Sequence, residues 1–131
     1  MTGKIQFDLV SPERLLLSQP VDMVTIPGSD GYMGVMAGHI ALVSALRAGM
    51  IDMKDNGVDT RFFIRGGFAE INATQVTVLA EDAIPMTELD LAVLDQSIKD
   101  AQEDEIAAKS DAERLKAAQL VDDLKLVRAA F

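Results

Sequence analysis

The stretch Ile84–Leu91, which reads IPMTELDL, separates two parts of the chain that differ in composition. After Pro85 the sequence contains no further Gly or Pro, and Ala, Leu, Glu, Asp, Lys and Gln predominate. These residue types favour helices, whereas Gly and Pro interrupt them. We therefore expect helical structure over residues 86–131 and a different kind of structure before it.

Residues 1–85 alternate apolar and polar side chains, as half-buried strands do. The alternation is clearest in Ile5, Phe7 and Leu9, and it recurs in Val24 and Ile26, Phe62 and Ile64, and Val76 and Val78. Turn-forming residues separate the apolar runs, at Ser11-Pro12, Pro27-Gly28, Asp55-Asn56-Gly57 and Gly66-Gly67. We expect the backbone freedom of Gly66-Gly67 to serve a bend or bulge. The fold class predicted is α+β, with an N-terminal antiparallel β-sandwich over 1–85 and a C-terminal antiparallel two-helix hairpin over 86–131.

Two capping boxes divide the C-terminal region into two helices. Thr87–Asp90 has the form of one box and Ser110–Glu113 has the form of the other, with a tight joint near Lys109. Each predicted helix carries an apolar stripe at helical spacing, so the stripes should face each other in a hairpin. The predicted seam consists of Leu91, Leu94, Ile98, Leu120, Leu124 and Val127.

Charge and composition exclude several classes of partner. The chain has 131 residues, 12 Lys and Arg against 21 Asp and Glu, and a formal net charge of −9, which repels the phosphates of nucleic acid and anionic lipid. No apolar run reaches the ~20 residues that span a bilayer, so we expect no direct membrane insertion. The absence of Cys excludes disulfides and thiolate metal sites.

Candidate catalytic residues are scarce. His39 is the one His of the sequence, so neither a two-His metal site nor a His-Glu-x-x-His motif exists. Ser44 is the one conceivable nucleophile near it, and a lone His in a glycine-rich turn is more often structural. Glu81-Asp82 is an adjacent acid pair, whose members would point to opposite faces of a strand. We therefore expect no catalytic residue, no metal site and no cofactor.

Five segments in order resemble the epsilon subunits of bacterial F-type ATP synthases, the counterparts of the mitochondrial delta subunit. The resemblance covers essentially all 131 residues, since an N-terminal β-sandwich followed by a C-terminal helical hairpin is also the family's fold. The segments are Phe7–Glu13 (FDLVSPE), Pro27–Val35 (PGSDGYMGV), Gly38-His39, Arg65–Glu70 (RGGFAE) and Val76–Glu81 (VTVLAE).

This resemblance implies a non-catalytic rotor subunit of the central stalk. Members of the family bind the gamma subunit and sit on the ring of c subunits, and they couple rotation of the ring to the catalytic head. The family's loop at Gly31, Tyr32, Met33 and Gly34 contacts the c ring, and His39 is expected at the same end. Many relatives carry an acid where Tyr32 stands, so the contact would be more apolar here.

The resemblance also implies a location and a regulatory role. The chain is expected at the cytoplasmic face of the bacterial inner membrane as a peripheral part of the complex. Its hairpin is expected to regulate ATP hydrolysis through the catalytic beta subunits. The charged face of the helices is otherwise explained as an ordinary solvated surface.

The nucleotide motif of some bacterial members is degenerate in this sequence. It consists of Ile or Leu, Asp, two variable residues, Arg and Ala. Leu89 and Asp90 match its start, but Val93 stands where the Arg is required. Without that guanidinium the site loses its means of neutralising phosphate, so we expect weak ATP binding or none.

An alternative function stays open at this point. A free-standing β-sandwich could bind a small ligand and dimerise through its helical hairpin. Such a protein would be a dimer on its own, whereas a stalk subunit would be a monomer alone and would co-purify with gamma.

Overall fold

The computed structural model describes residues 3–130. The chain divides into two compact units, Met1–Met86 and Thr87–Phe131, close to the boundary after residue 85 that the change of composition predicts. Among the described residues, all the strands lie in the first unit and both helices lie in the second, and a short 3₁₀ turn spans the boundary.

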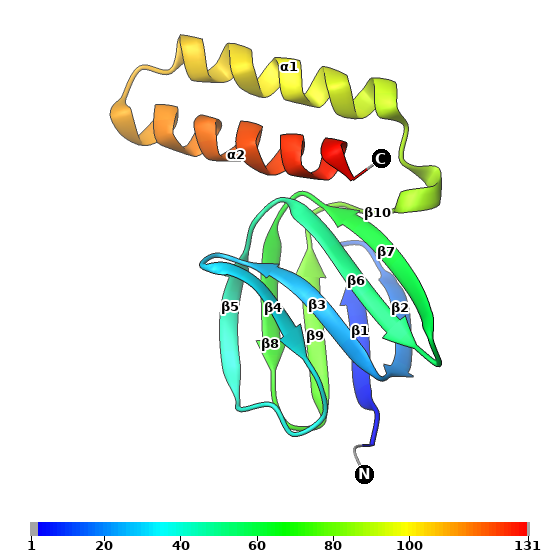
Figure 1. The fold of residues 1–131 in the computed structure, drawn as a ribbon. Coiled ribbons are helices and arrows are strands. Elements are labelled where there is room, and N and C mark those ends of the chain that lie inside the picture. The colour runs from blue at the N-terminus through cyan, green and yellow to red at the C-terminus, as the bar shows by residue number, and fades with distance from the viewer. Residues whose placement is uncertain (1–2, 131) are drawn as a thin grey trace. The chain divides into compact units, whose positions relative to one another are not determined.

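The first unit is a single sheet curled into two layers (Figure 1). One layer has the strand order β10-β7-β6-β3 with β4 also paired to β3, and the other has the order β5-β8-β9-β1-β2. The layers join at one residue pair, Gly28 of β3 with Leu46 of β5. The strands are β1 (Ile5–Val10), β2 (Leu15–Val21), β3 (Met23–Gly28), β4 (Gly31–Val35), β5 (Leu42–Leu46), β6 (Gly49–Asp55), β7 (Val58–Ile64), β8 (Gly67–Ile71), β9 (Gln75–Ala80) and β10 (Ala83–Pro85).

The predicted alternation is confirmed in the core between the layers. Ile5, Phe7 and Leu9 of β1 are fully buried, and the residues between them are half-buried. The same holds for Val76 and Val78 of β9. The sandwich therefore buries one side of each layer, and each strand turns every second side chain outward.

One strand pair departs from the predicted antiparallel arrangement. β1 runs parallel to β9, in register from Gln6 opposite Gln75 to Val10 opposite Leu79. The two strands are far apart in the sequence, so no short hairpin turn forces them to run in opposite directions. All other pairs in the sheet are antiparallel.

The second unit is a helical hairpin of α1 (Leu91–Ala107) and α2 (Asp111–Ala129), preceded by η1 (Met86–Glu88). The capping box predicted at Thr87 is wrong, because Met86–Glu88 form the 3₁₀ turn and Asp90 caps α1. The Asp90 Oδ1 accepts a hydrogen bond of 2.8 Å from the Ala92 amide. An Asp directly before the helix satisfies the free amides that Thr87 was expected to satisfy.

The cap predicted at Ser110 is confirmed. Its hydroxyl accepts a hydrogen bond of 3.1 Å from the Glu113 amide. The Glu113 Oε2 accepts one of 3.0 Å from the amide of Lys109, one residue before the cap. This reciprocal pair fixes the joint between the helices near Lys109.

The predicted seam residues differ in burial. Leu94, Leu124 and Val127 are buried, Ile98 and Leu120 are half-buried, and Leu91 is exposed. Leu91 is the first residue of α1. Arg128 Nε lies 2.8 Å from Asp95 Oδ1 and ties the end of α2 to the start of α1. Over residues 3–130, neither helix combines the length and apolar character needed to cross a membrane.

Replacing Ser110 with Ala is expected to lower the free energy of unfolding by about 1 kcal/mol, because the Glu113 amide at the start of α2 loses its partner. Thermal unfolding of the full chain, followed by circular dichroism at the helical minimum, measures the effect. Thr87→Ala is the matched control and should leave the stability unchanged. Equal losses in the two variants would contradict the assignment of the caps.

Candidate functional site

Four of the residues expected to contact the c ring, Gly31–Gly34, lie in strand β4 and not in a loop. The turn of this β3–β4 hairpin lies at Ser29 and Asp30. Tyr32 is 53% exposed, and its hydroxyl accepts a hydrogen bond of 3.2 Å from the Met50 amide at the start of β6. A Cβ on Gly49 would lie 2.7 Å from that hydroxyl and 3.0 Å from the Pro27 Cβ, so a larger residue at position 49 would have to displace the Tyr32 side chain.

His39 follows β4 in the chain, whereas Tyr32 lies within that strand. The expectation that both belong to one end stays a prediction. Tyr32 is the second residue of β4, and the rest of that strand, a rise of about 10 Å, follows it before the turn that leads to His39. The neighbouring Gly38 amide donates a hydrogen bond of 2.8 Å to Ala73, in the turn between β8 and β9. The His39 Nδ1 lies 2.7 Å from the Ile40 carbonyl oxygen. His39 thus has the structural environment of a turn residue.

The conceivable catalytic pair and the nucleotide motif also have structural partners. The Ser44 hydroxyl donates to the Ala45 carbonyl at 2.9 Å, and His39 is bonded to its own turn. The Asp90 carboxylate caps α1, and Val93 is exposed in the first turn of that helix. Asp90 therefore has a role in folding that requires no nucleotide.

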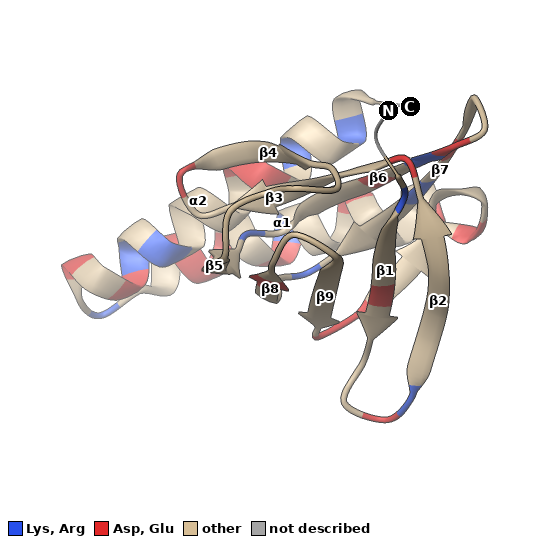
Figure 2. Cartoon of the chain, turned by 90° about the horizontal axis from the view of Figure 1, so that it is seen from below, with Lys and Arg blue, Asp and Glu red and all other residues tan. Residues whose placement is uncertain are grey.

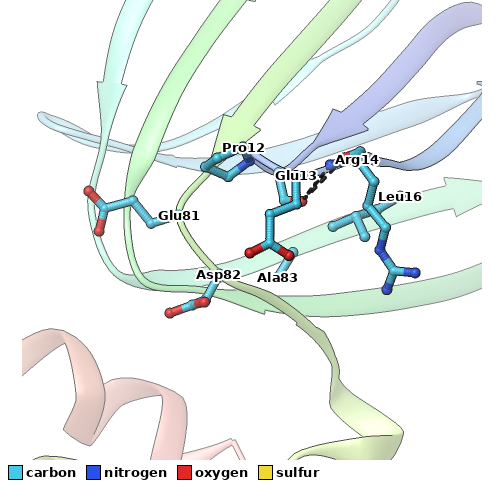
Figure 3. A pocket seen from close by; sticks show the side chains of 8 residues that line it. Pro12, Glu13, Arg14, Leu16, Glu81, Asp82 and Ala83 are labelled. Atoms are coloured by element: carbon cyan, nitrogen blue, oxygen red, sulfur yellow. Dashed lines mark hydrogen bonds between the residues drawn. The ribbon is translucent and has the colours of Figure 1, made fainter.

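A small pocket lies between the β1–β2 turn and the β9–β10 turn (Figure 3). Its volume is about 230 Å³, and its lining includes the carboxylates of Glu13, Glu81 and Asp82. These three side chains do not converge on one point (Figure 3), and Asp82 Oδ2 lies 3.4 Å from Arg65 Nε. Over residues 3–130, no three His, Cys, Asp or Glu side chains are grouped so as to hold a metal ion. The pocket is smaller than the ~300 Å³ at which ligand sites begin.

An apolar stripe crosses the outer face of the second layer. Its residues are direct cross-strand neighbours, so they form one continuous row over β5, β8, β9, β1 and β2. Phe68 is 60% exposed, Leu79 47% and Leu15 58%. The apolar stripe consists of Ala45, Phe68, Leu79, Val10 and Leu15.

The apolar stripe continues into a second pocket at the end of β5 and β8. Val43, which is two residues from Ala45 on the same face, is 71% exposed. It lines a pocket of about 450 Å³ together with Ala41, Leu42, Glu70, Ile71 and Asn72. Large apolar side chains in one exposed row are typical of a protein–protein interface. This outer face is the candidate docking site.

Sequence reasoning missed the apolar stripe, although part of its signal is present in the sequence. In β8 (GFAEI) and β9 (QVTVLA), Phe68 and Leu79 occupy the outward phase of the alternation, where polar residues are usual. That phase identifies two exposed apolar residues. It does not reveal that Phe68 and Leu79 are cross-strand neighbours, because the sequence of a single strand does not give its register with the next strand.

A polar network lies beside the apolar stripe on the outer face. The Asp8 Oδ1 accepts hydrogen bonds from Ser18 Oγ at 2.6 Å and from Gln6 Nε2 at 3.0 Å, and Asp8 Oδ2 accepts one from Gln75 Nε2 at 2.8 Å. These side chains come from β1, β2 and β9. The hydrogen bond from Ser18 lowers the pKa of the Asp8 carboxyl most, followed by those from Gln6 and Gln75. Partial desolvation opposes them, but the pKa stays below its ordinary value.

This pKa shift predicts a pH dependence of stability. Because the pKa of Asp8 is lower in the folded chain than its ordinary 3.8, the carboxylate stabilises the fold above that pH, and the contribution is lost as the pH falls through the folded pKa. Asp8→Asn should therefore be less stable than the wild type at pH 7, and the difference should shrink below pH 3.8. Urea unfolding at the two pH values measures it. A constant difference would contradict the prediction.

Known proteins that are similar to this chain point to one family. The model of the "ATP synthase, Delta/Epsilon chain, beta-sandwich domain" matches residues 4–86. The ATP synthase epsilon chain of Parvibaculum lavamentivorans is 50% identical and that of Maricaulis maris is 45% identical. The first alignment covers 98% of both chains, and the second covers 98% of this chain and 97% of the relative.

Two solved structures share the fold. A chain in the mitochondrial ATP synthase of Euglena gracilis, solved with OSCP, F1 and the c-ring, aligns with a TM-score of 0.81 at 26% identity and covers 99% of this chain and 82% of that one. A chain in the central stalk and c-ring structure of Tetrahymena thermophila mitochondrial ATP synthase aligns with a TM-score of 0.72 at 16% identity, over 98% and 97% of the two chains. The second similarity concerns the fold alone.

Proposed function

The chain belongs to the family of ATP synthase delta and epsilon chains, and from this premise we propose that it is a non-catalytic rotor subunit that docks on the gamma subunit through the apolar stripe. In this role it transmits rotation of the c ring to the catalytic head. The family assignment favours this function over a free-standing ligand-binding dimer.

The apolar stripe is the observation that carries the proposal. An exposed Phe and two exposed Leu in one row are costly to leave in water, and covering them releases about 25 cal/mol for each Å² of apolar surface. A stalk subunit has to keep its partner through every rotation, so it needs a continuous surface of this kind. A non-catalytic role agrees with the separate hydrogen bonds of His39 and Ser44.

Co-purification tests this function. A tagged copy of the chain, expressed with the gamma subunit of the same ATP synthase, should retain gamma after washing. The chain expressed without gamma should be a monomer. A chain that purifies without gamma and forms a dimer by itself would support the ligand-binding alternative.

The remaining parts of the function follow from the same premise. We propose that the β3–β4 hairpin, with Tyr32, contacts the c ring and that the complex lies at the cytoplasmic face of the bacterial inner membrane. The helical hairpin regulates ATP hydrolysis through the catalytic beta subunits. Asp90 and Val93 do not supply a phosphate-binding group, so ATP binding is weak or absent.

A Cys at Tyr32 is expected to form an oxidative cross-link with a Cys in the polar loop of the c subunit, because Tyr32 is 53% exposed on the proposed contact strand. The chain has no Cys of its own, so the product is unique. Asp59→Cys, on the β7 strand, is the matched control and should not cross-link. Intact membranes that yield no product at position 32 would count against the c-ring contact.

A further inference from the structure

The strands of the second layer carry acidic side chains and no basic ones. Strands β1, β2, β5, β8 and β9 contain no Lys or Arg, and in Figure 2 β1, β2, β8 and β9 are almost entirely tan, whereas basic and acidic residues alternate along α2. Asp8 and Glu70 point outward from β1 and β8, one row from the apolar stripe.

In the first layer, acidic side chains form ion pairs with basic side chains of the same layer. Arg61 Nε lies 3.5 Å from Asp52 Oδ2, and Lys54 Nζ lies 3.8 Å from Asp59 Oδ1. These carboxylates are balanced within β6 and β7. The hydrogen-bond partners of Asp8, in contrast, are neutral, so its charge is fixed in position but not balanced by a neighbouring cation in the second layer.

The network around Asp8 leaves a defined acceptor position. An ionised carboxylate offers about four lone-pair sites. Oδ1 uses two of them, for Ser18 and Gln6, and Oδ2 uses one, for Gln75. One site on Oδ2 remains for a further donor, and the orientation of the carboxylate is already fixed. When a partner donates to this site, the Asp8 side chain loses little conformational entropy, because it is already ordered.

We propose that Asp8 is the polar anchor of the docking face, and that the partner seated on the apolar stripe places a Lys or Arg side chain against Asp8 Oδ2. This inference rests on the proposed function. When the apolar stripe is covered, the adjacent carboxylate loses water, and an unpaired buried charge is strongly unfavourable. A cation from the partner restores the balance and fixes the register of docking.

Binding of charge variants tests the proposal. The probe is an ATP synthase catalytic complex that contains gamma and lacks this chain, and the Kd is measured by biolayer interferometry at increasing salt. Asp8→Asn keeps the size of the side chain and removes the charge, and should raise the Kd about 10- to 100-fold and flatten its salt dependence. Asp59→Asn makes the same chemical change on the other layer, and its Kd should stay within about twofold of the wild type.

The outcomes separate this inference from the proposed function. If Asp8→Asn binds like the wild type while Phe68→Glu does not, the anchor is wrong and the docking face stands. If Phe68→Glu also binds normally, the docking face itself is wrong. A wild-type Kd that does not change with salt would by itself contradict the ion pair. The proposal can therefore be tested even if a variant fails to fold.

Discussion

Replacing Gly67 with Val should lower the free energy of unfolding by about 3 kcal/mol or more, the largest effect on stability that we expect from one substitution. Gly67 begins β8 with a φ of +150°, and a Cβ built there would lie 2.0 Å from the Leu79 carbonyl oxygen and 3.0 Å from the Ala80 Cα. The backbones of β8 and β9 approach each other at this point, so neither can yield without breaking the ladder. Urea unfolding followed by circular dichroism measures the loss.

Gly66→Ala is the control for this prediction. Gly66 also has a positive φ, of +124°, but a Cβ there would lie 3.4 Å from its nearest neighbour, the Leu46 carbonyl oxygen. This variant carries backbone strain without a collision and should lose about 1 kcal/mol. If the two variants are equally stable, the close approach of β8 to β9 is not what Gly67 serves.

Replacing Phe68 with Glu should weaken binding to the gamma-containing complex about 100-fold or more and leave the fold intact. Phe68 is the aromatic residue of the apolar stripe, and aromatic residues often carry a large share of the binding energy of an interface. A carboxylate there would be buried without a partner. Since the side chain is 60% exposed in the chain alone, the melting temperature should change little.

Val58→Glu is the matched control for this binding measurement. Val58 is 64% exposed at the start of β7, in the other layer of the sandwich. The Val58→Glu variant also replaces an exposed apolar side chain with a carboxylate, and the Kd of this variant should equal that of the wild type. Equal weakening by both variants would mean that added charge, and not the place of Phe68, reduces binding.

The sequence predicts the fold because the signals for it are local. The alternation of Ile5, Phe7 and Leu9 and the loss of Gly and Pro after Pro85 each depend on residues that are close in the chain. The start of α1 was predicted three residues too early because Thr87 and Asp90 are both good caps, and composition does not choose between them.

The candidate site is less predictable because it depends on neighbours distant in sequence. Val10, Ala45, Phe68 and Leu79 meet through the pairing of β5, β8, β9 and β1. A strand pattern states which side chains share a face, but not which strands are adjacent. Local composition also misled in one place, because Gly31–Gly34 read as a loop and form part of β4 instead.

Cysteine labelling in the assembled enzyme tests the docking face most directly. The chain has no native Cys, so Val43→Cys and Val58→Cys each introduce a single thiol, at positions that are 71% and 64% exposed. In the chain alone the two thiols should react with a maleimide at similar rates. In the assembled ATP synthase the thiol at position 43 should react at least about tenfold more slowly, because a partner covers the outer face, and position 58 should be unchanged. Full reactivity at position 43 in the assembled enzyme would contradict the account.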